Sequence, residues 1–228
     1  SVNGSSTSNN VSSNGITITV NEGVIKTSLF GGAKGNSTYT PYVMGDILVT
    51  VNGGNLGDIF GGNHAAGPPN GNVEIHLKGG TIGRVFGGGN NASVKTNYIY
   101  LEGSTCNEIF GGSNASGTVD NTTIETTSGE VTTIYGGNNT AGNTVTSKIT
   151  INCGKITSTV YGGGNLAETT TTNVTLNASD IPNVFGGGAN ANVVTSTTIN
   201  LNGSNVGNLY GGSNAGGNIP SSNITLNK

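Results

Sequence analysis

Hydrophobic and polar residues alternate in short segments that return along the whole chain. In residues 16–20, 47–51 and 73–77, every second residue is Ile, Val or Leu, and mostly polar residues such as Thr, Glu and His stand between them. Successive side chains of a β-strand point to opposite faces, so this alternation places one face against a core and the other towards solvent. The pattern predicts half-buried strands.

A second motif follows each alternating segment and consists of an aliphatic residue, an aromatic residue and two glycines. One copy reads VFGGGNN over residues 85–91, and other copies read IFGGNHA, IYGGNNT and LYGGSNA. A further apolar residue stands four positions before the aromatic, as Ile82 does before Phe86, which indicates a second short strand. A third, weaker strand is predicted around Val94, Val119, Val145, Val193 and Ile219.

The motif returns at a nearly constant interval. Its aromatic residues are Phe30, Phe60, Phe86, Phe110, Tyr135, Tyr161, Phe185 and Tyr210, and their successive separations are 30, 26, 24, 25, 26, 24 and 25 residues. The abundance of Gly, Thr and Asn excludes helical repeats, and the interval is too short for a propeller blade. Leucine-rich repeats have a similar period, but their Leu-rich signature is absent. We therefore predict an all-β fold, a single right-handed parallel β-helix with coils of about 25 residues and three short strands per coil.

The domain organisation follows from the extent of the repeats. Residues 1–15 are a polar linker or N-terminal lead-in, and residues 16–228 form the repeat domain. The sequence ends in SSNITLNK, one strand into a new coil. An open solenoid edge invites aggregation and natural arrays cover it, so we expect the repeats to continue or to be capped beyond residue 228.

The recurring residues of the motif are predicted to form structural ladders. We attribute the paired glycines to a sharp corner that needs both positive φ and room for a stacked neighbour. The aromatic residues are expected to form a mostly buried stack, with an exposed aromatic stripe as the alternative. Asparagines four residues after the aromatic are expected to hydrogen-bond along the solenoid. They are Asn90, Asn114, Asn139, Asn165 and Asn214.

Composition narrows the range of functions. Charged residues make up 8% of the 228 residues and the net charge is −3, so the chain is a poor partner for nucleic acid. No run of about 18 apolar residues occurs, and we expect no membrane insertion in this segment. The combined share of glycine and proline is below that typical of low-complexity chains and the glycine is periodic, which argues against disorder.

Two copies of the repeat, TTNVTLNASDIPNVFGGGAN and STTINLNGSNVGNLYGGSNAGGN, are similar to repeats of a known family. The chain resembles the glycine-rich parallel β-helix repeats of large bacterial cell-surface adhesin-like proteins, from about Ile16 to its end. The resemblance implies a secreted or surface-exposed adhesin or stalk whose partners are host or dietary glycans or a host surface protein. It brings no catalytic motif, and we predict a non-catalytic domain without a cofactor.

A carbohydrate-active enzyme, either a polysaccharide lyase or a glycosidase, is the alternative function, because parallel β-helices also support such enzymes. The charged residues Asp58, Arg84 and Glu108 stand two residues before their aromatics, and we interpret them as a solvated ladder of alternating charge. His64 and His76 lie on different sides of the coils, which argues against a metal site. Cys106 and Cys153 are expected at inward positions, too far apart for a disulfide.

Ice binding is a more distant alternative, suggested by alternating threonines such as Thr17 and Thr19. An ice-binding face should be flat and uniform, and the equivalent positions in later coils hold Glu, His and Tyr. The first coil also carries an insertion, AKGNSTYTPYVMGD, which adds about five residues. Insertions of this kind form a loop on a binding face or a cap over the solenoid end, and both interpretations stay open.

One outward-facing group departs from the Thr and Asn found elsewhere on its face. Glu74 and His76 should face outward on one coil, with Tyr98 and Tyr100 directly above them and Glu125 on the next coil. Aromatic rings flanked by acids and an imidazole suit sugar recognition, because ring faces stack on C–H groups and polar neighbours bind hydroxyls. The alternative is that the two tyrosines only stabilise the sheet.

Overall fold

The computed structural model describes residues 15–36, 38–65, 67 and 71–227, which form strands and turns with no helix. The lead-in predicted over residues 1–15 lies outside the described residues, Gly15 excepted. The strands are β1 (Ile16–Val20), β2 (Val24–Phe30), β3 (Ile47–Val51), β4 (Asn55–Phe60), β5 (Val73–Leu77), β6 (Thr81–Phe86), β7 (Val94–Phe110), β8 (Thr118–Tyr135), β9 (Asn143–Ile151), β10 (Lys155–Tyr161), β11 (Glu168–Asn177), β12 (Asp180–Phe185), β13 (Val193–Asn202), β14 (Asn205–Tyr210) and β15 (Ser222–Asn227).

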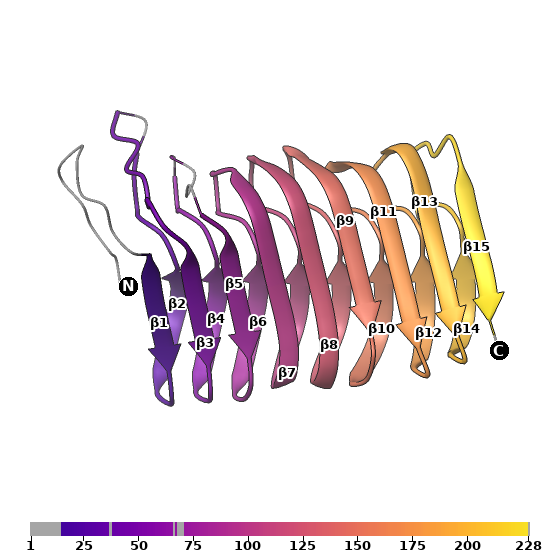
Figure 1. The fold of residues 1–228 in the computed structure, drawn as a ribbon, viewed down its shortest axis with the longest axis horizontal. Coiled ribbons are helices and arrows are strands. Elements are labelled where there is room, and N and C mark those ends of the chain that lie inside the picture. Colours follow the sequence, from indigo (N-terminus) through magenta and orange to yellow (C-terminus); the bar gives the residue numbers. More distant parts are fainter. Residues whose placement is uncertain (1–14, 37, 66, 68–70, 228) are drawn as a thin grey trace.

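All strand pairs are parallel and stack along one axis, which confirms the predicted β-helix (Figure 1). The first ladder contains β1, β3, β5, β7, β8, β9, β11, β13 and β15 in that order. The second ladder contains β2, β4 and β6, then the C-terminal parts of β7 and β8, and then β10, β12 and β14. The front strands in Figure 1 run downwards, those behind run upwards and each coil lies to the right of the last, so the helix is right-handed.

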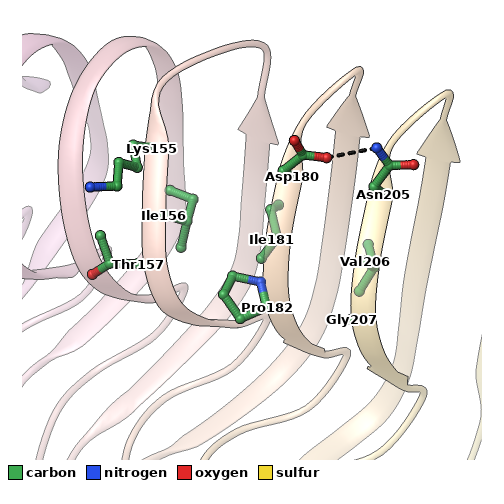
Figure 2. Close-up of a pocket in the computed structure, with 9 residues that line it drawn as sticks. All are labelled: Lys155, Ile156, Thr157, Asp180, Ile181, Pro182, Asn205, Val206 and Gly207. Carbon is green, nitrogen blue, oxygen red and sulfur yellow. Dashed lines mark hydrogen bonds between the residues drawn. The ribbon is translucent and has the colours of Figure 1, made fainter.

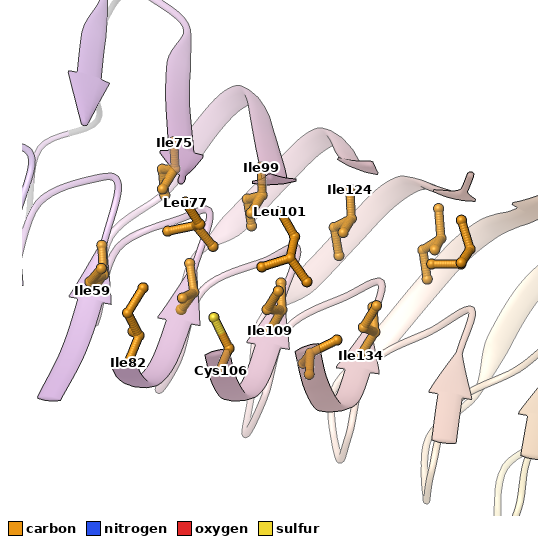
Figure 3. Close-up of a cluster of buried hydrophobic side chains, with 14 of the residues drawn as sticks. Ile59, Ile75, Leu77, Ile82, Ile99, Leu101, Cys106, Ile109, Ile124 and Ile134 are labelled. Carbon is orange, nitrogen blue, oxygen red and sulfur yellow. The ribbon is translucent and has the colours of Figure 1, made fainter. Parts of the chain in front are cut away.

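The alternation of the sequence sets the register of the first ladder. Val49 pairs with Ile75, which pairs with Ile99, so aliphatic side chains at the same position of each coil stack on one another. These three side chains have no exposed surface. Figure 3 shows how the inward residues of both ladders meet along the axis. Fully burying such a side chain contributes roughly 1.5–3 kcal/mol, and the repetition makes one continuous core.

The third strand of each coil joins the first strand without a break in the middle and later coils. Val94 opens β7 and pairs with Val119 in β8, and both side chains are buried. Val145 lies in β9 as predicted, and the inward residue beside it is Thr144, which pairs with Val119. Ile219, the last residue predicted for this strand, lies outside the strands.

The prediction that the paired glycines need positive φ is wrong. Positive φ occurs at turn glycines such as Gly54, Gly80 and Gly129, whereas none of the paired glycines has it. Close approach of the neighbouring coil explains the pairs. A Cβ on Gly87 would lie 2.5 Å from the carbonyl oxygen of Gly111, and one on Gly61 would lie 2.6 Å from that of Gly87. Any larger residue would therefore force the coils apart.

The aromatic residues form a stack that is separate from the aliphatic core. Consecutive rings from Phe30 to Tyr210 are nearly parallel, with centroids 4.5–5.2 Å apart. Phe60, Phe86 and Phe110 form the buried centre of this stack, whereas Tyr210 is 48% exposed. The stack is thus mostly buried, and burial raises the pKa of the Tyr135 hydroxyl to about 12.

The asparagine ladder runs through part of the predicted set. The amide of Asn114 donates to Asn90 over 2.8 Å, Asn139 donates to Asn114 over 2.8 Å, and Asn165 donates to Asn139 over 2.9 Å. Asn214 leaves the ladder and its amide donates to the Tyr161 hydroxyl. A second ladder, which sequence reasoning missed, links Asn152, Asn177, Asn202 and Asn227.

The cysteines differ in environment. Cys106 is buried in the core among Ile82 and Ile109, as Figure 3 shows, and Cys153 is exposed. The prediction that both point inward is therefore wrong for Cys153, because it lies in the turn after β9, where the strand alternation has ended. Both thiols are free.

Candidate functional site

The outward group expected from the sequence is assembled on the first ladder. Glu74 pairs with Tyr98 and His76 pairs with Tyr100, because β5 and β7 are in register. On the next strand, Glu125 pairs with Tyr100. Glu102 joins this group through its contact with His76. We refer to Glu74, His76, Tyr98, Tyr100, Glu102 and Glu125 as the His76 patch.

Two carboxylates hold the imidazole of His76. Its Nε2 lies 2.7 Å from Glu74 Oε1 on the same strand, and its Nδ1 lies 2.7 Å from Glu102 Oε2 on the next coil. A neutral imidazole has only one N–H, so both nitrogens donate only in the protonated ring. Sequence reasoning missed Glu102, although it stands two residues after Tyr100 and so continues the same outward alternation.

The rings of His76 and Tyr100 stack on one another. Their centroids are 4.8 Å apart and the planes differ by 17°. One face of the Tyr100 ring is therefore covered by the imidazole, which corrects the expectation that this face is free to stack on a sugar. Tyr98 makes no ring contact with another described residue. The two tyrosines thus offer different surfaces to a ligand. Tyr100 offers its ring edge and hydroxyl, whereas Tyr98 offers a ring that has no stacking partner.

The electrostatic environment of the patch is negative. Burial raises the pKa of Tyr100, and the carboxylates of Glu74, Glu125 and Glu102 raise it further together with Tyr98. Glu125 is itself anchored, because Oε1 accepts a 2.6 Å hydrogen bond from the amide of Asn152. The patch therefore combines ordered acceptors with partly buried aromatic rings.

The predicted charge ladder lies on the second ladder of strands. Asp58 pairs with Arg84, and Arg84 pairs with Glu108. Arg84 donates to Asp58 from Nε over 3.0 Å and from Nη2 over 2.5 Å, and this hydrogen bond raises the pKa of the guanidinium. Burial raises the pKa of Glu108, while Arg84 opposes that shift. The arrangement is a row of alternating charges, as expected.

A shallow groove of about 690 Å³ lies across β10, β12 and β14 (Figure 2). A β-bulge between Ile156 and Thr159 gives β10 an extra residue, so β10 pairs with β12 only from Thr159 onwards. Pro182 in β12 lacks the N–H that a ladder needs. Asp180 accepts a 2.7 Å hydrogen bond from Asn205 at the rim. The sequence signals were the 26-residue separation before Tyr161 and this proline.

The inserted loop of the first coil contributes to both core and surface. Val43 is buried in the aliphatic core, whereas Tyr39 is 71% exposed and Tyr42 is 55% exposed. The Asn36 side chain accepts hydrogen bonds from the N–H groups of Thr38 and Tyr39, each over 2.8 Å. The loop is thus anchored by one aliphatic residue and a turn, and it presents two tyrosines.

The two histidines considered for a metal site lie apart from each other. His64 packs edge-on against Phe30, with centroids 5.0 Å apart, and does not join His76. Within the described ranges, no group of three His, Cys, Asp or Glu side chains has a geometry that could hold a metal ion. The part of the chain that the structure describes contains no helix long and apolar enough to cross a bilayer.

Comparisons of the chain with protein-family models, with curated proteins and with solved structures found no match.

Proposed function

We propose that this chain is a non-catalytic repeat domain of a bacterial extracellular surface protein, acting as an adhesin or stalk that contacts glycans through the His76 patch. The observation that carries the proposal is the grouping of Glu74, His76, Tyr98 and Tyr100 on one flat outward face. Elsewhere that face is formed largely by threonine and asparagine, as at Thr150, Thr175 and Asn200, for example.

The solenoid supports such a role because it holds the patch rigidly. Each strand beneath the patch is paired on both sides, and the side chains below it belong to the continuous core. Sites on regular strands keep their geometry better than sites on loops, so ordering them costs less on binding. A stalk benefits from the same continuity, because every coil is bonded to its neighbours.

A glycan array with host and plant polysaccharides tests this function. The variant Tyr98→Ala, Tyr100→Ala should lose binding while its melting temperature falls by only a few degrees. The variant Thr175→Ala, Asn200→Ala, on the same face but in later coils, should bind like the wild type. Binding that survives in the tyrosine variant, or an array without a bound glycan, contradicts the proposal.

One observation favours a carbohydrate-active enzyme as the second candidate. Glu74 and Glu102 flank one imidazole, and glycosidases act with paired carboxylates. Each carboxylate, however, already uses one oxygen to hold the same imidazole, which favours a role in orienting His76. Incubation with polysaccharides followed by a reducing-end assay decides between the two. Turnover that disappears in Glu74→Gln would establish the enzyme.

A further inference from the structure

Main-chain pairing along the second ladder is interrupted at one place among the described strands. Glu130 pairs with Lys155 before this place and Asp180 pairs with Asn205 after it, so the other coils are joined from the start of the second-ladder segment. Between β10 and β12, in contrast, pairing begins only at Thr159. The groove across β10, β12 and β14 lies at this interruption (Figure 2).

The bulge in β10 does not explain the interruption by itself, because β2 contains a bulge at the same position. The register of β2 shifts between Ile25 and Ser28, yet Val24 and Ile25 still pair with β4. The residue of β4 opposite that bulge is Gly57, and a Cβ placed there would lie 2.3 Å from the carbonyl oxygen of Thr27. The neighbouring coil therefore accommodates a bulge when the opposite residue is glycine.

Pro182 occupies the position of that glycine in β12, three residues before the aromatic, and Gly207 occupies it in β14. A proline brings a Cβ and a ring to a place where the bulge leaves no room for them, and it has no N–H to donate. The carbonyl of Ser158 in the bulge instead accepts a hydrogen bond from the side-chain amide of Asn183 over 3.3 Å. Pro182 opposite a bulge thus explains why the two strands separate here.

The separation gives the groove a main-chain wall and an apolar floor. Lys155, Ile156 and Thr157 of β10 line the groove, and none of them pairs with β12. Pro182 is exposed, and Gly207 on the next strand has no side chain to cover the proline ring. Main-chain groups outside a ladder are the feature by which sheets bind extended peptides. An extended peptide therefore matches this wall.

The charges at the rim favour a basic partner. Lys155 Nζ lies 3.1 Å from Glu130 Oε2, so these two charges compensate one another. Asp180 accepts a 2.7 Å hydrogen bond from the neutral amide of Asn205, and it forms no ion pair with any residue that the structure describes. One negative charge thus stands uncompensated beside the apolar floor. A Lys or Arg next to an apolar residue complements both features.

We propose that this groove binds an extended, basic peptide segment of a partner protein. The main chain of the peptide lies along residues 155–157, an apolar side chain covers Pro182, and a Lys or Arg contacts Asp180. The volume of about 690 Å³ falls within the range, roughly 300–1,000 Å³, of sites for small ligands, so a short segment fills it. The groove is on the second ladder and the His76 patch is on the first, so this partner is additional to the glycan.

The test is a titration of the whole chain with labelled, end-blocked hexapeptides, measured by fluorescence polarisation. Alternating valine and lysine gives a basic peptide, and alternating valine and glutamate gives its acidic counterpart. Valine favours an extended conformation in both. We expect the basic peptide to bind roughly tenfold more tightly, which corresponds to about 1.4 kcal/mol. N-methylation of its main chain should weaken binding, because it removes the donors that the β10 carbonyl groups accept.

Two variants and a matched control connect this binding to the groove. Pro182→Gly introduces the residue that β4, β6 and β14 have at this position, so it should close the ladder and abolish binding of the basic peptide while the chain stays folded. Asp180→Asn should remove the preference for the basic peptide. Asp120→Asn, which changes an exposed acid of β8 outside the groove, should keep it. Hydrogen–deuterium exchange provides a second measurement, since the amides of residues 155–158 should exchange more slowly in Pro182→Gly.

The outcomes separate this proposal from the glycan site. Equal affinity for the two peptides, or equal effects of Asp180→Asn and Asp120→Asn, overturns recognition of a basic partner. Peptide binding that persists in Pro182→Gly overturns the site, and unchanged exchange in that variant contradicts the role of the proline. Binding of the anionic apolar dye anilinonaphthalene sulfonate, but of neither peptide, would assign the groove to small apolar molecules. Loss of binding in Pro182→Gly together with loss of preference in Asp180→Asn supports the proposal, whatever the glycan array shows.

Discussion

At the scale of single residues, glycine is required at the corner of each coil because neighbouring coils lie in close contact there. The first glycine of each pair lacks positive φ, yet in every pair from Gly31 to Gly186 an added Cβ would collide with the carbonyl oxygen of a glycine in the next coil. Gly212 is different, because the nearest atom to a Cβ placed there is Ile219 Cδ1 at 3.7 Å. The two positions therefore predict opposite tolerance of the same substitution.

Overpacking typically costs about 1–3 kcal/mol, and we expect Gly87→Ala to destabilise the chain by at least that much, because the neighbouring backbone cannot rotate away. Gly212→Ala should change stability little. Urea unfolding of both variants measures the difference. Equal stability of Gly87→Ala and the wild type would show that the coils can separate without cost.

The two thiols should differ sharply in reactivity. Burial raises the pKa of the Cys106 thiol to about 12, and only the thiolate is an effective nucleophile. Cys153 is exposed. A thiol reagent at pH 8 should label one cysteine in the native chain and a second only after denaturant is added. Rapid labelling of Cys106 in the native chain would contradict the packed core.

At the scale of structural elements, buried polar residues form a ladder along the first set of strands from β7 to β13. Thr172 Oγ1 donates to the carbonyl of Gly186 over 2.6 Å, and Thr197 Oγ1 donates to that of Gly211 over 2.8 Å. Thr122 occupies the same ladder position, but its buried hydroxyl has no partner within the described part of the chain. The same position in β5 holds Val73.

We expect Thr122→Val to stabilise the chain by about 1 kcal/mol, since a buried hydroxyl without a partner is replaced by a methyl group of similar size. Thr172→Val should instead cost about 1 kcal/mol, because it removes a satisfied hydrogen bond. Denaturant unfolding of the two variants checks the signs. A loss of stability in Thr122→Val would mean that its hydroxyl is satisfied by water.

Strand positions were predictable from the sequence because their determinants are periodic. The alternation over β3 and β5 fixed which residues face inward, and the aromatic spacing fixed which coils stack. Features that depend on contact across coils were not accessible in the same way. The ring orientation of Tyr100 depends on its stacking with His76, and the role of Glu102 depends on where its side chain reaches. The outward position of Cys153 was missed because alternation does not extend into turns.

At the scale of the whole molecule, the free energy of local opening should vary along the axis of the solenoid. Ile124 in the middle of the first ladder has no exposed surface, whereas Ile224 and Leu226 in β15 are 37% and 72% exposed. β15 also pairs with one strand only among the described strands, β13. Local opening requires less free energy where fewer apolar contacts are lost.

Hydrogen–deuterium exchange followed by mass spectrometry should therefore be slowest in peptides that cover β7 and β8 and fastest in β15. The expected gradient reflects neighbour contacts, as in other repeat architectures. A uniform exchange rate along all coils would contradict this and would indicate a single cooperative unit with no weaker end.

The position of a bound sugar is the most direct measure of whether the His76 patch is the recognition surface. We predict that a crystal structure of the chain with an oligosaccharide that it binds on the array will place a sugar ring beside Tyr98, with a hydroxyl within hydrogen-bonding distance of the Glu74 or Glu102 carboxylate. An oligomer bound instead in the groove across β10, β12 and β14, or beside Tyr39 and Tyr42 of the inserted loop, would contradict it.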